Sequence, residues 1–359
     1  MVKRAQLLAL LLVTTSLCAV NLSTGSAQEK TAEQSYKNIQ VLKGVPASQI
    51  EAVMASFTGS LGVRCNHCHI PGQFEKDDKP AKQTARKMIR MVFELNKGSF
   101  DGRGAVTCVT CHRGQTKPAN VPVLGQSLWL PSNQAAKQEA PLPSAEQILE
   151  RYVQASGGRQ AVERVTSRVW KGSRVGADGV LVPEEVYAKA PNKLLTVTSY
   201  PNLVFRTGFD GARGWAMSNQ SARDLPPEMQ AQLRREAEFY KEMRLKDIYS
   251  KLAVVGRETV GGREAYVVEA APADGGDLEK LYFDAETGLL VRKYSEAKTV
   301  LGRFPTQTDY EDYREVDGVK LPFSIRWSIP GRAWGRKITE VRQNVPLDDA
   351  QFNPPAGGN

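Results

Sequence analysis

The sequence predicts an α + β protein of two domains: a small α-helical domain, then a mostly antiparallel, curved β-sheet domain, a half-barrel with covering helices. Three observations support this fold class. Apolar residues recur at helical spacing before residue 118, short alternating apolar runs separated by turn residues begin near Val165, and several prolines lie between the two regions. A chain of 359 residues is long enough to bury two hydrophobic cores.

Residues 1–27 have the features of a Sec-type signal peptide. Two basic residues precede an apolar run of about 16 residues, and small polar residues follow as far as Ala27. The run is shorter than the roughly 20 residues of a membrane-spanning helix, so we favour cleavage over a permanent anchor. Lipid attachment at Cys18 is less favoured, because Leu17 stands where a small residue is expected. We therefore expect a periplasmic protein.

The first domain, predicted over residues 37–125, contains two helices with apolar residues on one face. The first helix follows Pro46 and carries Met54 on its apolar side. The second runs from about Lys82 to Asn96, and its three-to-four residue spacing predicts an apolar stripe. That stripe consists of Ala85, Met88, Met91 or Val92, and Leu95.

A proline-containing linker over residues 118–143 is expected to join the two domains. The second domain, residues 144–359, opens with a helix that Ser144 and Gln147 cap. The alternating runs that follow predict roughly eight to ten antiparallel strands. One helix, at about residues 227–240, interrupts them.

Two C-x-x-C-H runs carry the clearest chemistry in the chain. Two cysteines at this spacing can each form a thioether bond to one vinyl group of the same porphyrin, and the next histidine reaches the iron. The runs therefore predict two covalently attached haem c groups, with iron. Their residues are Cys65, Cys68 and His69 for one haem, and Cys108, Cys111 and His112 for the other. Since c-type haem is attached outside the cytoplasm, the motifs and the expected signal peptide support each other.

An electron-transfer haem is usually six-coordinate, so each iron needs a second axial ligand. His67 lies between the cysteines of its own motif and cannot reach the far face of that haem. It could reach the other haem, but we favour a role at the surface or beside the site. The first domain then offers three methionines as donors: Met54, Met88 and Met91. Histidine and methionine together raise the reduction potential of a haem relative to two histidines.

Residues from about 37 to 118 resemble one dihaem half of the photosynthetic reaction centre cytochrome c subunit family, whose members carry four haems. The resemblance implies that Met54 binds the iron of the Cys65 and Cys68 haem. It also implies that Met88 binds the iron of the other haem and that Met91 has a packing role. The residues that carry the resemblance are the Met54 helix followed by Leu61-Gly62-Val63-Arg64-Cys65, the basic segment Ala85-Arg86-Lys87-Met88-Ile89-Arg90-Met91, and Val106-Thr107-Cys108-Val109-Thr110-Cys111-His112-Arg113-Gly114.

Two segments of the second domain, residues 281–289 and 310–322, loosely resemble the periplasmic lipoprotein-carrier family, which folds as a half-open antiparallel barrel. This resemblance implies an apolar cavity for a lipid-like or quinone-like ligand. The alternative, which we favour, is a docking module that positions the haem domain. No histidine or cysteine follows His112, so no metal or thiol chemistry is expected there.

The chain has a net charge of +9, and the basic surplus lies around the two motifs. Four haem propionates would offset it, which makes a nucleic-acid partner the poorer explanation. We therefore expect an electron carrier rather than an enzyme, with redox partner proteins in the periplasm or at the membrane surface. Two alternatives are a dihaem peroxidase, which needs an open iron position, and a lipid- or quinone-binding redox sensor.

Overall fold

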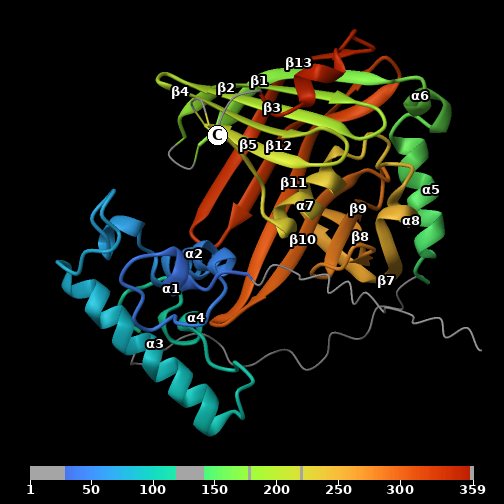
Figure 1. Cartoon of the computed structure of the whole chain (residues 1–359). Coiled ribbons are helices and arrows are strands. Elements are labelled where there is room, and N and C mark those ends of the chain that lie inside the picture. Colours follow the sequence, from blue (N-terminus) through green and yellow to red (C-terminus); the bar gives the residue numbers. More distant parts are fainter. Residues whose placement is uncertain (1–28, 119–140, 177–178, 219–220, 356–359) are drawn as a thin grey trace, which may run out of the picture.

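The computed structural model describes residues 29–118, 141–176, 179–218 and 221–355, and shows a helical region attached to a large curved sheet (Figure 1). The predicted α + β class is confirmed. The expected signal peptide, and residues 119–140 of the expected linker, lie outside the described residues. The domain bounds 37–125 and 144–359 therefore stay predictions.

The helical region is built around two long helices that precede the two cysteine motifs. Its elements are α1 (Ala32–Ser35), η1 (Ala47–Gln49), α2 (Ile50–Leu61), η2 (Cys65–His67), α3 (Pro80–Ser99) and α4 (Cys108–His112). Proline at the first position of α3 suits a helix start, because it has no amide hydrogen to leave unpaired. Gly62 ends α2 in the left-handed conformation, at φ 64°.

Helix α3 presents a different face to the core from the predicted apolar stripe. Ile89 and Val92 are buried with Val53 of α2. Of the predicted stripe, Val92 is buried, whereas Met88, Met91 and Leu95 are exposed. The core-facing side of α3 also contains long polar side chains that donate hydrogen bonds to the backbone of loops. A prediction based on apolar periodicity does not place polar residues on a buried face.

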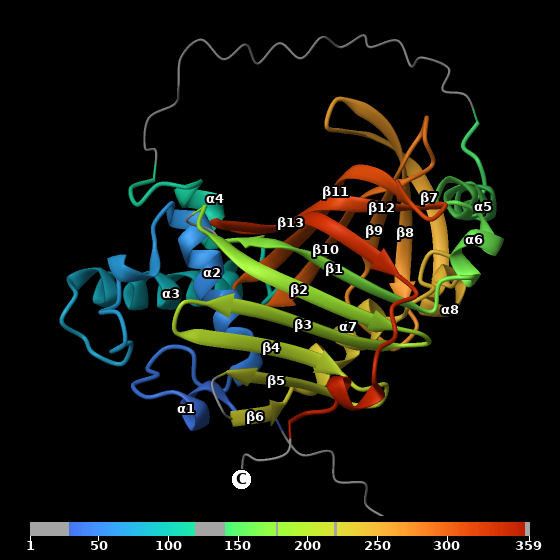
Figure 2. The same cartoon turned by 90° about the horizontal axis from the view of Figure 1, so that it is seen from above.

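The sheet is antiparallel throughout and open at both edges (Figure 2). Its strand order is β6-β5-β4-β3-β2-β1-β13-β12-β11-β10-β9-β8-β7, so among the described strands only the β1–β13 pair joins strands distant in sequence. The strands are β1 (Ser167–Val175), β2 (Leu181–Lys189), β3 (Lys193–Tyr200), β4 (Leu203–Phe209), β5 (Gly214–Ser218), β6 (Ser221–Asp224), β7 (Tyr249–Val260), β8 (Arg263–Pro272), β9 (Glu279–Asp284), β10 (Leu290–Thr299), β11 (Gly302–Val316), β12 (Val319–Ile329) and β13 (Arg332–Gln343).

The described residues contain 13 strands, more than the eight to ten predicted. The three that were missed are β5, β6 and β7. Strands β5 and β6 are short. In β7 the pairing register shifts between Val254 and Gly256, and such a bulge interrupts the alternation on which the prediction relied.

Short helices cover the sheet and complete its cores. They are α5 (Ala145–Ala155), α6 (Arg159–Glu163), α7 (Pro227–Ala237), α8 (Leu245–Ile248) and η3 (Asp349–Phe352). The predicted capping of α5 is confirmed, because the Ser144 and Gln147 side chains each accept the other's backbone N–H. Helix α5 buries Tyr152 against Phe283 and its neighbours. Within the described residues, no helix combines the length and apolar character needed to cross a bilayer.

Candidate functional site

The first cysteine motif lies in a tight turn that orients its histidine. Cys65 is exposed and Cys68 is half-buried. The Nδ1 atom of His69 lies 3.0 Å from the carbonyl oxygen of Phe74, and the two rings meet edge to face at 5.4 Å. A carbonyl at this position takes the Nδ1–H, so Nε2 is left as the nitrogen that can bind a metal.

The second motif shows the same arrangement on a different scaffold. The motif forms helix α4, and Thr107 and Thr110 close a capping box at its start. The Nδ1 atom of His112 lies 2.9 Å from the carbonyl oxygen of Gln115. Both histidines of the two C-x-x-C-H motifs are therefore held in one tautomer by a nearby backbone carbonyl, with Nε2 free of that bond.

Burial sets the protonation of several motif residues. Burial, with help from the positive charges of Lys82 and Arg86, lowers the pKa of His69 and favours the neutral ring that a metal requires. Burial also raises the pKa of the Cys68 and Cys108 thiols. Neither cysteine is thus a thiolate of the kind that free catalytic cysteines need.

Sequence reasoning missed a group of charged residues that holds the loop receiving His69. Lys82 Nζ donates to the carbonyl oxygens of Phe74, Glu75 and Lys76 at 2.9, 3.1 and 2.7 Å. Arg86 Nη1 lies 2.8 Å from Asp77, and these cations hold the pKa of that carboxyl well below its usual value.

Lys82 and Arg86, whose side chains are buried, therefore anchor the loop that holds His69 to α3. Lys82 and Arg86 are four residues apart and so share one face of the helix. This spacing was the only available signal in the sequence, and it is also common on solvent-facing helices.

The two motifs are neighbours in space. The backbone N–H of Gly114, just after the second motif, donates to Ser60 of α2 at 2.8 Å. A Cβ atom on Gly62, just before the first motif, would lie 2.1 Å from the Gly114 oxygen. Only glycine therefore fits at position 62. Because Gly62 has no side chain, the two motifs can lie together across the end of α2.

The methionines predicted as iron ligands lie on the helices that precede the motifs. Met54 is half-buried on α2 and packs against the helical core. Met88 lies on α3 with 37% of its surface exposed, on the same face as Met91 and Leu95, which are 41% and 39% exposed. These three side chains form an apolar strip on the surface. The flat apolar face of a porphyrin would remove such a strip from water.

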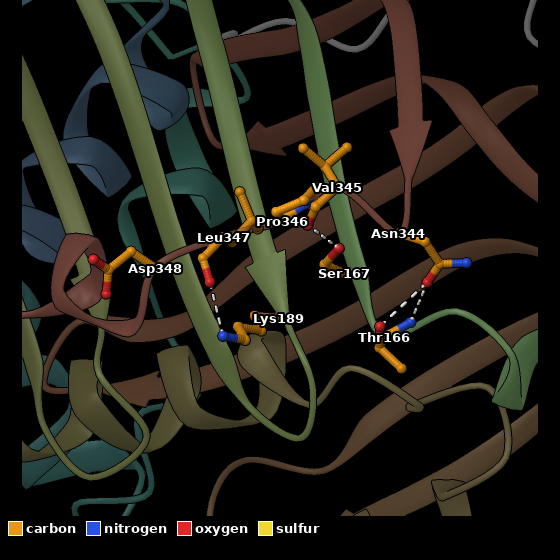
Figure 3. Close-up of a pocket in the computed structure, with 8 residues that line it drawn as sticks. All are labelled: Thr166, Ser167, Lys189, Asn344, Val345, Pro346, Leu347 and Asp348. Atoms are coloured by element: carbon orange, nitrogen blue, oxygen red, sulfur yellow. Dashed lines mark hydrogen bonds between the residues drawn. The ribbon is translucent and has the colours of Figure 1, made fainter.

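A cavity of about 450 Å³ on the sheet lies where the C-terminal segment crosses β1 and β2 (Figure 3). Its polar groups hold that segment in place. Ser167 Oγ donates to Val345 O at 2.6 Å, Lys189 Nζ donates to Leu347 O at 2.8 Å, and Asn344 accepts from the Thr166 backbone at 2.8 Å. The cavity therefore belongs to the attachment of the C-terminal segment.

Residues 7–149 match the family model described as photosynthetic reaction centre cytochrome C subunit. The predicted resemblance to this family is confirmed. The photosynthetic reaction center cytochrome c subunit of Thermochromatium tepidum is 34% identical over 91 residues, 24% of this chain and 22% of that protein. Cytochrome c-554 of Chloroflexus aurantiacus is 39% identical over 82 residues, 21% of this chain and 20% of that protein. The chain thus spans about a fifth of the length of these relatives.

Solved structures similar to the chain cover a different part of it. A DUF1329 family protein from Desulfovibrio piger aligns with a TM-score of 0.45 and 15% identity, over 58% of this chain and 97% of its own. A LolA superfamily protein from Nitrosomonas europaea aligns with a TM-score of 0.42 and 15% identity, over 59% of this chain and 99% of its own.

Proposed function

We propose that this chain is a periplasmic dihaem c-type cytochrome, an electron carrier rather than an enzyme. Cys65 and Cys68 would bond one haem c, and Cys108 and Cys111 would bond the other. The matched family and the curated relatives are cytochromes c, which supports haem-based electron transfer. Bound haem supplies a one-electron couple, and the protein supplies ligation, orientation and burial.

The observation that carries the proposal is the shared orientation of His69 and His112. In each motif a backbone carbonyl within 3.0 Å of Nδ1 selects the tautomer that leaves Nε2 for the iron. The two histidines reach this arrangement from different local structures, a 3₁₀ turn and a short α-helix. A chance loop conformation would not be expected to recur in both motifs.

Met54 and Met88 are proposed as the second axial ligands. Met54 would serve the haem of Cys65 and Cys68, and Met88 the haem of Cys108 and Cys111. The exposed apolar strip on α3 supports a porphyrin against that helix. Methionine as the second axial ligand raises the reduction potential of both haems. A raised potential suits a carrier that accepts electrons from periplasmic or membrane-surface redox proteins.

For the C-terminal sheet we propose a docking role rather than a lipid cavity. Glu279 accepts a 2.5 Å hydrogen bond from Tyr249, and its carboxylate lies 3.7 Å from Lys293 and 4.0 Å from Arg235 of α7. This charged group occupies the face of the sheet that α5 and α7 cover. Hydrocarbon chains avoid such a surface because its charges would lose their polar surroundings.

The test is haem quantitation and spectroscopy of the full chain, exported in a strain that matures c-type cytochromes. We expect two haems per chain by the pyridine haemochrome method. In the oxidised protein, Met54→Ala and Met88→Ala should each weaken the red absorption band typical of histidine–methionine haem and lower the midpoint potential of one haem. Met91→Ala, on the same face of α3, is the matched control: it removes an apolar contact of the strip but no proposed iron ligand, so it should leave the red band unchanged.

Other outcomes would contradict this proposal or favour one of the alternative functions. A single haem would contradict the dihaem proposal. A high-spin oxidised spectrum that Met88→Ala does not alter would mean an open iron position and favour the peroxidase alternative. A lipid or quinone that copurifies with the chain would favour the redox-sensor alternative over a docking role.

A further inference from the structure

The sheet inserts one of its turns into the helical core. Leu301, between β10 and β11, is 5% exposed and belongs to the same buried cluster as Val53 of α2 and Ile89 of α3. Met54 packs against this cluster. The helix that carries a proposed iron ligand therefore packs partly on a residue of the sheet.

A second turn of the sheet packs directly on α2. A Cβ atom on Gly59 would lie 2.5 Å from Cβ of Pro330, and one on Gly331 would lie 2.9 Å from Oγ1 of Thr58. Backbones that approach this closely leave little room for relative movement. Figures 1 and 2 show the strand ends meeting the helical region at this place. The tips of the strands are therefore fixed relative to the first cysteine motif.

A cavity of about 880 Å³ lies between these strand tips and the first motif. The helical region forms one wall and includes Cys65 itself, the first of the two cysteines that would bond a haem. The ends of strands β1, β2, β3 and β13 and their turns form the other walls. The lining includes Cys65, Arg174, Val180, Leu181 and Arg332.

Among the residues that the structure describes, the cavity lining combines cations with exposed apolar side chains and contains no acid. Val180 and Leu181 of the lining are 55% and 59% exposed. Arg332 stacks on Trp334 at 5.4 Å and has no carboxylate partner among the described residues. Arg174 lies 3.6 Å from Glu184.

Glu184 does not neutralise the charge of Arg174 alone, because it also accepts hydrogen bonds from Arg336 and Thr198. The described part of the lining therefore keeps a positive surplus beside an apolar surface. A flat apolar group that carries carboxylates complements both features.

We propose that the sheet forms the outer wall of the site of the haem bonded at Cys65 and Cys68, and that Arg332 and Arg174 bind its propionates. The inference rests on the proposed function and assigns a second part of the chain to one of the two haem sites. A cation beside the propionates favours the reduced haem, because reduction removes one positive charge from the iron centre. The sheet would thereby raise the potential of one haem and leave the other unaffected.

The test measures the midpoint potentials of both haems in the full, haem-loaded chain by spectroelectrochemical titration. Arg332→Gln should lower the potential of one haem only, the one whose potential also falls in Met54→Ala. Adding Arg174→Gln should lower it further, whereas Arg332→Lys, which keeps the charge, should retain most of the wild-type value. Arg342→Gln is the matched control: Arg342 lies at the other end of β13 and pairs with Glu340 at 2.8 Å.

Three results separate this inference from the proposed function. Unchanged potentials in the double variant, with both haems bound, would overturn the inference and leave the electron-carrier function standing. An equal fall in Arg342→Gln would also overturn it, because the effect would then be one of overall charge. A wild-type chain that binds no haem would overturn the proposed function itself.

Discussion

Replacing Leu301 with alanine tests whether the sheet and the helical region share one core. The side chain is 5% exposed within the cluster of the helical region, so truncation leaves a cavity there. Leu→Ala in a packed core costs roughly 2–5 kcal/mol of unfolding free energy. The neighbouring Val300 is 42% exposed, and Val300→Ala should change that free energy by no more than about 0.5 kcal/mol.

The assay is urea unfolding of the haem-loaded full chain, followed by two signals. Haem absorbance reports the helical region, and tryptophan fluorescence reports the sheet, because the tryptophans of the described residues lie in strands: Trp170, Trp215, Trp327 and Trp334. We expect the two transitions to coincide in the wild-type chain. In Leu301→Ala a loss of about 3 kcal/mol would move the haem transition down by about 1.5 M urea, for a slope near 2 kcal/mol/M.

Equal haem midpoints for Leu301→Ala and Val300→Ala would refute the reasoning, because the buried and the exposed residue would then contribute alike. A fall in Leu301→Ala with both transitions still coincident would mean that the leucine stabilises the whole chain as one unit.

Three further predictions concern stability. Gly59→Ala should lower the melting temperature, because its Cβ would lie 2.5 Å from a proline. Gly98→Ala has nothing within 4 Å and should raise the unfolding free energy by up to about 1 kcal/mol through helix propensity. A stability gain in both variants would contradict the close approach at Gly59. Asp77→Asn should lower the urea midpoint at pH 7. A carboxyl whose folded pKa lies below its ordinary 3.8 stabilises above that value and loses the effect as pH falls, so the difference should shrink below about pH 4, and a constant difference down to pH 3 would contradict it. Phe352→Ala, fully buried beneath the sheet, should cost about 3–5 kcal/mol in urea unfolding, and a cost below about 1 kcal/mol would mean that the C-terminal segment contributes little.

Local patterns in the sequence were sufficient for the fold class and for several elements. The helix with Met54, the helix that became α3 and the cap formed by Ser144 and Gln147 were all predicted, since each depends on residues within a few positions of one another. The strands with regular alternation were found for the same reason. The assignment of Met54 and Met88 as iron ligands stays a prediction.

The sequence by itself predicted the covalent chemistry, because two cysteines and a histidine within five positions can meet one porphyrin in a single turn of chain. Only the tertiary structure decided which face of α3 is buried and that Leu301 lies beside the Met54 helix. It also decided that Arg174 and Arg332 line a cavity at Cys65. These residues are separated by more than 100 positions from the motif they approach. Such contacts depend on how the whole sheet curves, and no local periodicity encodes that.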